Sequence, residues 1–246
     1  MPRRSAKWQP MLKDGRVVNR GEIIQLGTEC NDLVRIVVAV FDLEGFTNFY
    51  DSASVNKNIV VSAYMNGFLD WLNHRFANFP SRPGYWKFMG DGVLLVWEAE
   101  RDQMNSGTTG FALMNACWNM VHGETSYGTT FLPEFIKWVA KRWPCDYPQH
   151  LRVSLSVGHA VKYGSEQHSC EYTAECINIA SRLIKFNPGL YFTAHSDLVL
   201  GPEPERFGYL EKSIQIRGIN KRVAIYVDTD EFNGLLNKDK TKFRDM

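Results

Sequence analysis

The stretch VRIVVAVFD, residues 34–42, decides the fold more than any other part of the sequence. It is an apolar run rich in β-branched residues, which is typical of a strand buried on both faces. The run ends in a carboxylate, Asp42. We therefore expect a central strand with an acidic residue at its end, followed by a turn over the segment LEGFT, residues 43–47.

The segments after this strand alternate between helical and strand-like patterns. Apolar positions recur every three to five residues over 60–76, which predicts an amphipathic helix. Two short apolar runs, 85–89 and 93–97, flank Gly90-Asp91-Gly92, which predicts a β-hairpin with an acidic residue in its turn. The same patterns predict helices over 111–121 and 176–184, and strands over 151–163, 190–194, 213–217 and 223–227.

This order of elements predicts one α+β domain, a mostly antiparallel sheet with helices packed on it. We place the domain at residues 31–246, after a basic N-terminal extension over 1–30. An insertion near 122–148 interrupts it, and we expect a short helix around 134–141 within otherwise irregular chain.

Charge and cysteine content narrow the function class. A net charge of +1 argues against a protein that coats nucleic acid, because binding to a phosphate backbone normally requires a large basic excess. We interpret the basic N-terminus as a solvated arm that packs on a partner subunit; contact with anionic lipid or nucleic acid is the alternative. The longest apolar run is too short to span a membrane, and five cysteines without CxxC spacing favour a reducing cytoplasm.

Two acidic residues, Asp42 and Asp91, are expected to meet at one edge of the sheet if their strands pair. Divalent cations such as Mg²⁺ prefer oxygen ligands, and a pair of them can activate an attacking oxygen and stabilise a leaving one. Taken alone, each Asp is more often a turn former or a helix cap. Together they predict a metal site.

Four segments resemble motifs of the class III adenylate and guanylate cyclases. Residues 41–47 (FDLEGFT) resemble the F-x-D-I-x-G-F-T metal loop, and 87–91 (KFMGD) resemble the K-x-x-G-D hairpin. Residues 177–182 (INIASR) are similar to the V-N-x-A-x-R helix, and 216–221 (IRGINK) less closely to the V-K-G-K segment. The resemblance implies a ferredoxin-like class III cyclase catalytic domain.

The resemblance also implies a reaction and roles for individual residues. A nucleoside triphosphate would be converted to its 3′,5′-cyclic monophosphate and pyrophosphate, with two Mg²⁺ or Mn²⁺ ions per site. The site would be shared between the two chains of a homodimer. The implied metal ligands are Asp42, Leu43 and Asp91, the implied catalytic residues are Asn178 for the ribose and Arg182 for the α-phosphate, and Arg217 is implied to contact the triphosphate tail.

The resemblance implies that Lys87 helps to select the nucleotide base. Counting back without gaps from Asn178 gives the same implied role to Glu171. Tyr50 and Trp86 are bulky and lie beside these positions in the resemblance, so they could shorten a purine-sized cavity; core packing is the alternative interpretation. The chain also resembles the bacterial antiphage (Pycsar) pyrimidine cyclases over 41–47, 87–98 and 171–183. That implies cyclic UMP, or less favoured cyclic CMP, made for a separate effector protein.

Two other functions stay open. One is an adenylate cyclase that makes cyclic AMP, and the other is a catalytically silent cyclase-like domain that regulates a partner. The presence of both Asp42 and Asp91, with Asn178 and Arg182, argues against the silent domain. A diguanylate cyclase is disfavoured because no G-G-D-E-F-like string occurs.

Overall fold

The computed structural model describes residues 32–53, 56–99, 108–139, 142–163, 171–199 and 203–245. The basic N-terminal extension predicted from the sequence lies outside them. The chain divides into two compact units, of which the smaller contains, among the described residues, 32–33, 161–163 and 171–173. There β5 (Glu171–Thr173) pairs antiparallel with the end of β4 (His150–Tyr163). The main unit comprises residues 34–160 and 174–246.

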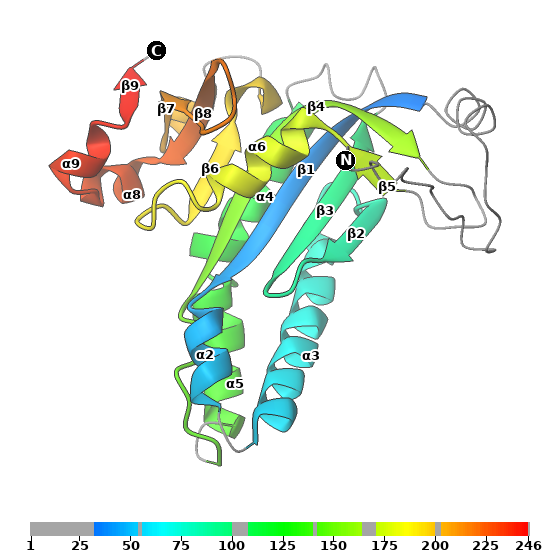
Figure 1. The fold of residues 1–246 in the computed structure, drawn as a ribbon, viewed down its shortest axis with the longest axis vertical. Coiled ribbons are helices and arrows are strands. Elements are labelled where there is room, and N and C mark those ends of the chain that lie inside the picture. Colours follow the sequence, from blue (N-terminus) through cyan, green and yellow to red (C-terminus); the bar gives the residue numbers. More distant parts are fainter. Residues whose placement is uncertain are drawn as a thin grey trace, which may run out of the picture. The chain divides into compact units, whose positions relative to one another are not determined.

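A mixed sheet forms the centre of the main unit (Figure 1). Its strand order is β2-β3-β1-β4-β6-β8-β7-β9, so the apolar run that opens the domain is an interior strand, as predicted. The β4 and β6 strands pair in parallel, whereas β1–β3, β2–β3, β6–β8, β7–β8 and β7–β9 pair antiparallel. The strands are β1 (Asp32–Glu44), β2 (Tyr85–Phe88), β3 (Gly92–Ala99), β4 (His150–Tyr163), β6 (Phe192–His195), β7 (Tyr209–Gln215), β8 (Arg222–Asp228) and β9 (Phe243–Asp245).

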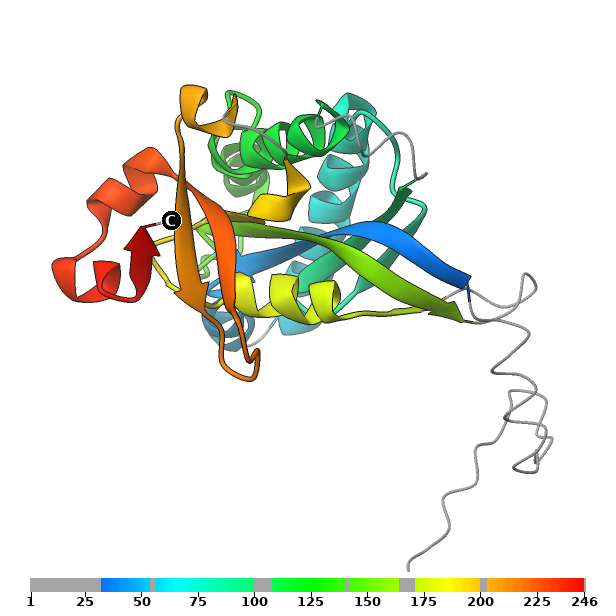
Figure 2. The same cartoon turned by 90° about the horizontal axis from the view of Figure 1, so that it is seen from above.

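Helices cover both faces of this sheet. Figures 1 and 2 show α3, α4 and α5 on one face and α6 on the other. The short C-terminal helices α8 and α9 lie beside β7 and β9. The helices are α2 (Phe46–Ser52), α3 (Lys57–Arg75), α4 (Thr108–His122), α5 (Leu132–Val139), α6 (Glu175–Leu183), α7 (Glu203–Arg206), α8 (Thr229–Gly234) and α9 (Asn237–Lys240), with 3₁₀ turns at Phe76–Asn78 and Ser196–Leu198.

Each face of the sheet has its own apolar core. On the face of α3 and α4, alternate β1 residues such as Val37, Ala39 and Phe41 pack in a large core that includes Phe68 and Tyr64. On the face of α6, a smaller, mainly aliphatic core joins that helix to the β7–β8 strand pair and includes Ile179, Leu183, Ile214, Ile216 and Ile219. Because successive strand residues point to opposite faces, Asp42, next to Phe41, belongs to the α6 face.

The predicted insertion is more regular than the sequence indicates. A π-helical turn, Tyr127–Phe131, leads directly into α5, which therefore begins before the predicted helix. Phe131 is buried, and its ring centroid lies 5.4 Å from that of Tyr64 on α3. Helix α5 lies where the short helix was expected, and residues 142–149 are irregular as expected. The expectation was wrong for 127–131, which is helical and packs its aromatic residues Tyr127 and Phe131 into the main core.

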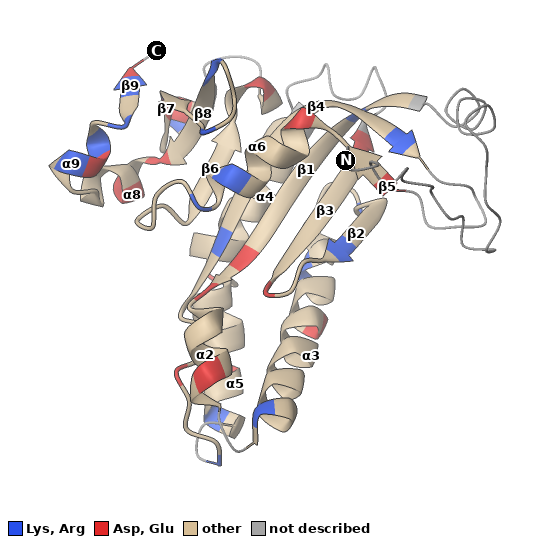
Figure 3. Cartoon of the chain, in the orientation of Figure 1, with Lys and Arg blue, Asp and Glu red and all other residues tan. Residues whose placement is uncertain are grey.

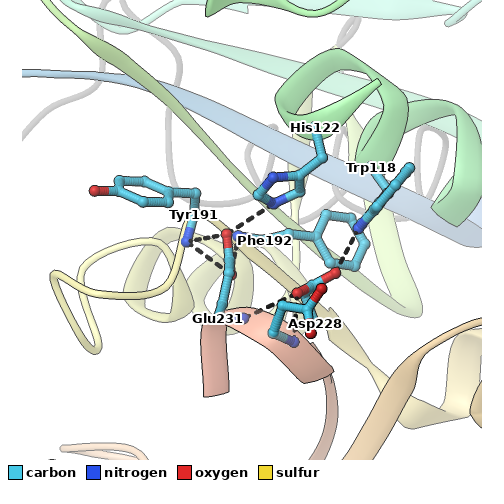
Figure 4. Close-up of polar contacts among 7 residues, drawn as sticks. Trp118, His122, Tyr191, Phe192, Asp228 and Glu231 are labelled. Carbon is cyan, nitrogen blue, oxygen red and sulfur yellow. Dashed lines mark hydrogen bonds and ion pairs between the residues drawn. The ribbon is translucent and has the colours of Figure 1, made fainter. Parts of the chain in front are cut away.

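A buried carboxylate fixes the end of β8 to its neighbours (Figure 4). Glu231, whose side chain is 7% exposed, accepts hydrogen bonds from the backbone N–H groups of Tyr191 and Phe192 and lies 2.7 Å from Nε2 of His122. Asp228, one turn earlier, accepts a 2.9 Å bond from the indole N–H of Trp118. These contacts join α8 to α4 and to the start of β6.

None of the helices in the described ranges is long and apolar enough to cross a lipid bilayer.

Candidate functional site

Strand pairing brings Asp42 and Asp91 to the same end of neighbouring strands. Asp42 is the register partner of Gly92, and the backbone N–H of Leu43 donates a 3.3 Å bond to the carbonyl of Asp91. A Cβ on Gly92 would lie 2.5 Å from the carbonyl oxygen of Phe41, so only glycine allows this approach. Gly90 has a φ of 86°, which closes the tight turn before Asp91.

The two carboxylates repel each other in a partly buried setting. Burial raises the pKa of Asp42 most, and the charge of Asp91 raises it further. Lys185 and Arg152 are close enough to lower the pKa of Asp42 in part, although Arg152 also forms an ion pair with Glu44. A carboxylate whose charge is disfavoured by burial and by a neighbouring carboxylate is a suitable ligand for cations, which would offset both effects.

Among the described residues, the carboxylate pair has no third acidic, histidine or cysteine ligand. Across the part of the chain that the structure describes, no group of three or more such side chains could hold a metal ion. Ions bound between Asp42 and Asp91 would need further oxygen ligands from the backbone, from water or from a substrate. Magnesium is commonly held in this way, by one or two carboxylates together with substrate phosphates.

Lys87 lies on the same sheet face as Asp42. It pairs with Leu94 of β3, which in turn pairs with Val40 of β1, two residues before Asp42. Residues paired across neighbouring strands share a face, so Lys87 and Asp42 point to the same side. Figure 3 shows acidic positions at the ends of β1 and of the β2–β3 turn, with basic positions on β2 and α6.

The structure does not bring Trp86 to this side of β2. Trp86 pairs with Leu95, so it points to the opposite face from Lys87, and its ring lies 5.6 Å from that of Phe88. Tyr50 lies on α2, where its ring faces the ammonium group of Lys57 at 3.9 Å. The geometry of Trp86 therefore does not support a base cavity shortened by its side chain.

Asn178 and Arg182 are both exposed on α6 and stand four residues apart, so they share the outer face of the helix. The opposite face of α6 buries Ile179 and Leu183 in the smaller core. This division of faces points both polar side chains away from the chain's own core. They are available to a molecule, or a second chain, on this side of the sheet.

Arg182 and Arg217 line one open pocket of about 660 Å³. The turn after β7 supplies Arg217 and Gly218, and the end of α6 supplies Arg182 and a third cation, Lys185. Lys185 is not among the residues that the matched motifs imply. Its signal was present, because a residue three positions after Arg182 lies on the same helical face.

Glu171 is the first residue of β5, where it pairs with Tyr163. It belongs to the smaller unit, whereas the other predicted site residues belong to the main unit. Its role in base selection stays a prediction from the sequence.

Comparisons with known proteins identify the fold. A comparison with models of known protein families finds no match, and one with curated proteins finds none either. Among solved structures, the adenylyl cyclase CyaB from P. aeruginosa is similar with a TM-score of 0.56 and 16% sequence identity, over 80% of this chain and 95% of that one. The guanylyl cyclase Cya2 is similar with a TM-score of 0.54 and 19% identity, over 80% of this chain and 93% of that one.

A bacterial light-regulated adenylyl cyclase is a further similar structure, with a TM-score of 0.51 and 14% identity over 82% of this chain and 52% of that chain. At these identities the similarity is one of fold. The fold class predicted from the sequence is thereby confirmed: the chain has the fold of class III cyclase catalytic domains, an α+β sheet dominated by antiparallel pairs with helices packed on it.

Proposed function

We propose that this protein is a nucleotidyl cyclase that converts a nucleoside triphosphate to a 3′,5′-cyclic monophosphate and pyrophosphate. The observation that carries the proposal is the convergence of Asp42 and Asp91 at adjoining strand ends, with Asp42 on the sheet face that also bears Lys87 and α6. A paired-carboxylate edge beside a cation-lined pocket suits a substrate that carries a chain of phosphates.

The reaction is balanced without any co-reactant. The ribose 3′-oxygen forms a bond to the α-phosphorus, the bond from that phosphorus to the bridging oxygen of the β-phosphate breaks, and the 3′-hydroxyl proton leaves to solvent. When bound between Asp42 and Asp91, with the Leu43 backbone beside them, two Mg²⁺ or Mn²⁺ ions would make the 3′-hydroxyl more acidic and neutralise charge on the pyrophosphate. Positioning and electrostatic stabilisation account for most catalysis in transfers of this kind.

The protein's own side chains would hold and orient the substrate. The amide of Asn178 can hydrogen-bond a ribose oxygen, and the guanidinium of Arg182, four residues on, can donate two parallel bonds to phosphate oxygens. Arg217, in the same pocket as Arg182, can bind the outer phosphates. These assignments rest on the matched motifs and on the shared pocket.

We further propose that the working form is a homodimer whose sites combine residues of both chains. The edge strand β2 supports this, because Trp86 and Phe88 are 49% and 36% exposed, and Met89 in the adjoining turn is 42% exposed. Large apolar side chains gathered on an edge strand usually mark a protein interface. Asn178 and Arg182, which face outward from α6, would complete the site around the carboxylates of the second chain.

For the substrate we propose UTP, with CTP as the less favoured pyrimidine. Lys87 is the support, since an ammonium group donates hydrogen bonds and the carbonyl at the distinguishing ring position of uracil accepts them. The product would act as a second messenger for a separate effector protein in bacterial antiphage defence, as the resemblance implies. The proposal expects no nucleic-acid partner, no membrane association and a cytoplasmic location.

The test is incubation of the purified chain with each of the four ribonucleoside triphosphates and Mg²⁺ or Mn²⁺, with products identified by mass spectrometry. We expect cyclic UMP as the main product, formed at least about a hundredfold more slowly by Asp42→Asn and Asp91→Asn chains. Cyclic AMP as the main product would keep the class and overturn the pyrimidine assignment. No cyclic product from any triphosphate, by a folded dimeric protein, would favour a silent regulatory domain.

A further inference from the structure

Three cations and no carboxylate line the pocket between the end of α6 and the turn after β7. Its charged side chains are Arg182, Lys185 and Arg217, and its uncharged polar ones are Ser181 and Gln215. Within the described part of the chain, none of the three cations takes part in an ion pair. A concave surface with this charge attracts a polyvalent anion.

The geometry explains how Lys185 reaches the pocket. The turn after α6 continues helically, because the N–H of Ile184 donates to Ala180 and that of Lys185 to Arg182. Residues three apart on such a turn lie on one face, so Lys185 projects beside Arg182. Gly218 closes the other side: a Cβ there would come within 2.6 Å of Nη1 of Arg182.

Resting on the proposed function, we infer that Lys185 is a further substrate-binding residue, which holds the outer phosphates of the triphosphate and the pyrophosphate product. Arg182 and Arg217 provide planar, directional donors, whereas an ammonium group on a flexible stem can follow the phosphates as they separate. Lys185 therefore contributes to binding of substrate and product about equally, and little to the rate of the chemical step.

A purely structural role for Lys185 has a different signature. A basic residue in the last turn of a helix stabilises that helix through its dipole, by a small amount at an exposed position. Lys185 also lies near Asp42 of its own chain. Either role would be measured as a change in stability or in metal binding, and neither requires that anion affinity change in a metal-free buffer.

The experiment is calorimetric titration of inorganic pyrophosphate into the full chain in EDTA, so that side chains rather than metal ions must bind the anion. Variants are Lys185→Ala, Lys185→Arg and, as a matched control, Lys221→Ala, which removes an exposed lysine near the same turn that does not line the pocket. We expect Lys185→Ala to weaken binding about three- to tenfold, which is about 0.7 to 1.4 kcal/mol, because the contact that is lost is one exposed charge pair. Lys185→Arg and Lys221→Ala should each change it less than about twofold.

Turnover gives a second readout. Lys185→Ala should raise KM for the triphosphate by a similar factor with kcat nearly unchanged. The inference is overturned if the wild-type chain does not bind pyrophosphate, if Lys185→Ala binds it like wild type, or if Lys221→Ala loses as much. A chain that binds pyrophosphate through Lys185 but cyclises no triphosphate would contradict the proposed reaction. The same result would still support the assignment of an anion-binding pocket.

Discussion

Gly218 lies against the guanidinium of Arg182, with room for a hydrogen and for nothing larger. A Cβ on Gly218 would be 2.6 Å from Nη1 and 3.4 Å from Cζ of Arg182. The glycine also has a φ of 78°, in the region that other residues rarely adopt. The turn after β7 thus limits where the side chain of Arg182, on α6, can lie.

Replacing Gly218 with alanine should therefore displace Arg182. We expect kcat/KM for cyclisation to fall about a hundredfold, the size of loss that a misplaced catalytic group can produce. Gly208→Ala is the matched control, because Gly208 has a φ of 85° but a Cβ added there would have nothing within 4 Å. Both variants should lose about 1 kcal/mol of stability, and similar activity in the two would contradict the role of Gly218.

Mixed dimers test the shared site. Chains with Asp42→Ala and chains with Arg182→Ala should each be inactive alone. After co-refolding or co-expression, half of the dimers are mixed and each mixed dimer has one intact site, so activity should recover to about a quarter of wild type. Mixing should restore nothing if each chain uses its own Asp42 and Arg182, provided that size measurements show dimers.

The charge of Asp42 should lower the stability of the metal-free protein while it supports cyclase activity. Asp42→Asn removes a partly buried charge and its repulsion from Asp91, so the melting temperature in EDTA should rise while cyclase activity falls about a hundredfold or more. The pKa of Asp42 is raised in the folded state, so its charge costs stability as pH rises. The gain should vanish below the ordinary aspartate pKa of 3.8. Asp146→Asn, at an exposed position, should change neither property.

The buried tyrosine pair should respond unequally to the loss of each hydroxyl. The hydroxyl of Tyr127 bonds both the hydroxyl of Tyr64 and the carbonyl of Pro148. Tyr127→Phe leaves two buried groups unpaired and should cost about 2 to 3 kcal/mol, whereas Tyr64→Phe leaves Tyr127 bonded to Pro148 and should cost less than about 1.5 kcal/mol. Urea unfolding measures both, and equal costs would contradict this bonding pattern.

The sequence predicted the parts of the fold that local pattern controls. The buried run that ends at Asp42, the hairpin around Asp91 and the helix that carries Arg182 all occur where periodicity placed them. Each has a strong local signal, either β-branched residues, a glycine-rich turn or one apolar helical face. Strand boundaries near the C-terminus were less well predicted, and β7 begins at Tyr209 rather than at residue 213.

The remaining features depend on contacts between distant segments. Nothing in the local pattern of Trp86 says that it points away from Lys87, which follows from the β2–β3 register. Lys185 becomes a pocket residue only when α6 packs beside the turn after β7. Tyr127 and Phe131 become core residues because α3 packs beside them, and this contact between distant segments is not visible in the local sequence.

The β7–β8 strand pair touches helices on both sides of the sheet. At one end, Asp228 is bonded to Trp118 of α4; toward the other, Ile216 and Ile219 are buried with Ile179 and Leu183 of α6. The β7–β8 strand pair therefore connects the helical layers on the two faces of the sheet. We therefore expect the position of the Arg217 turn to depend on the packing of α4 as well as on that of α6.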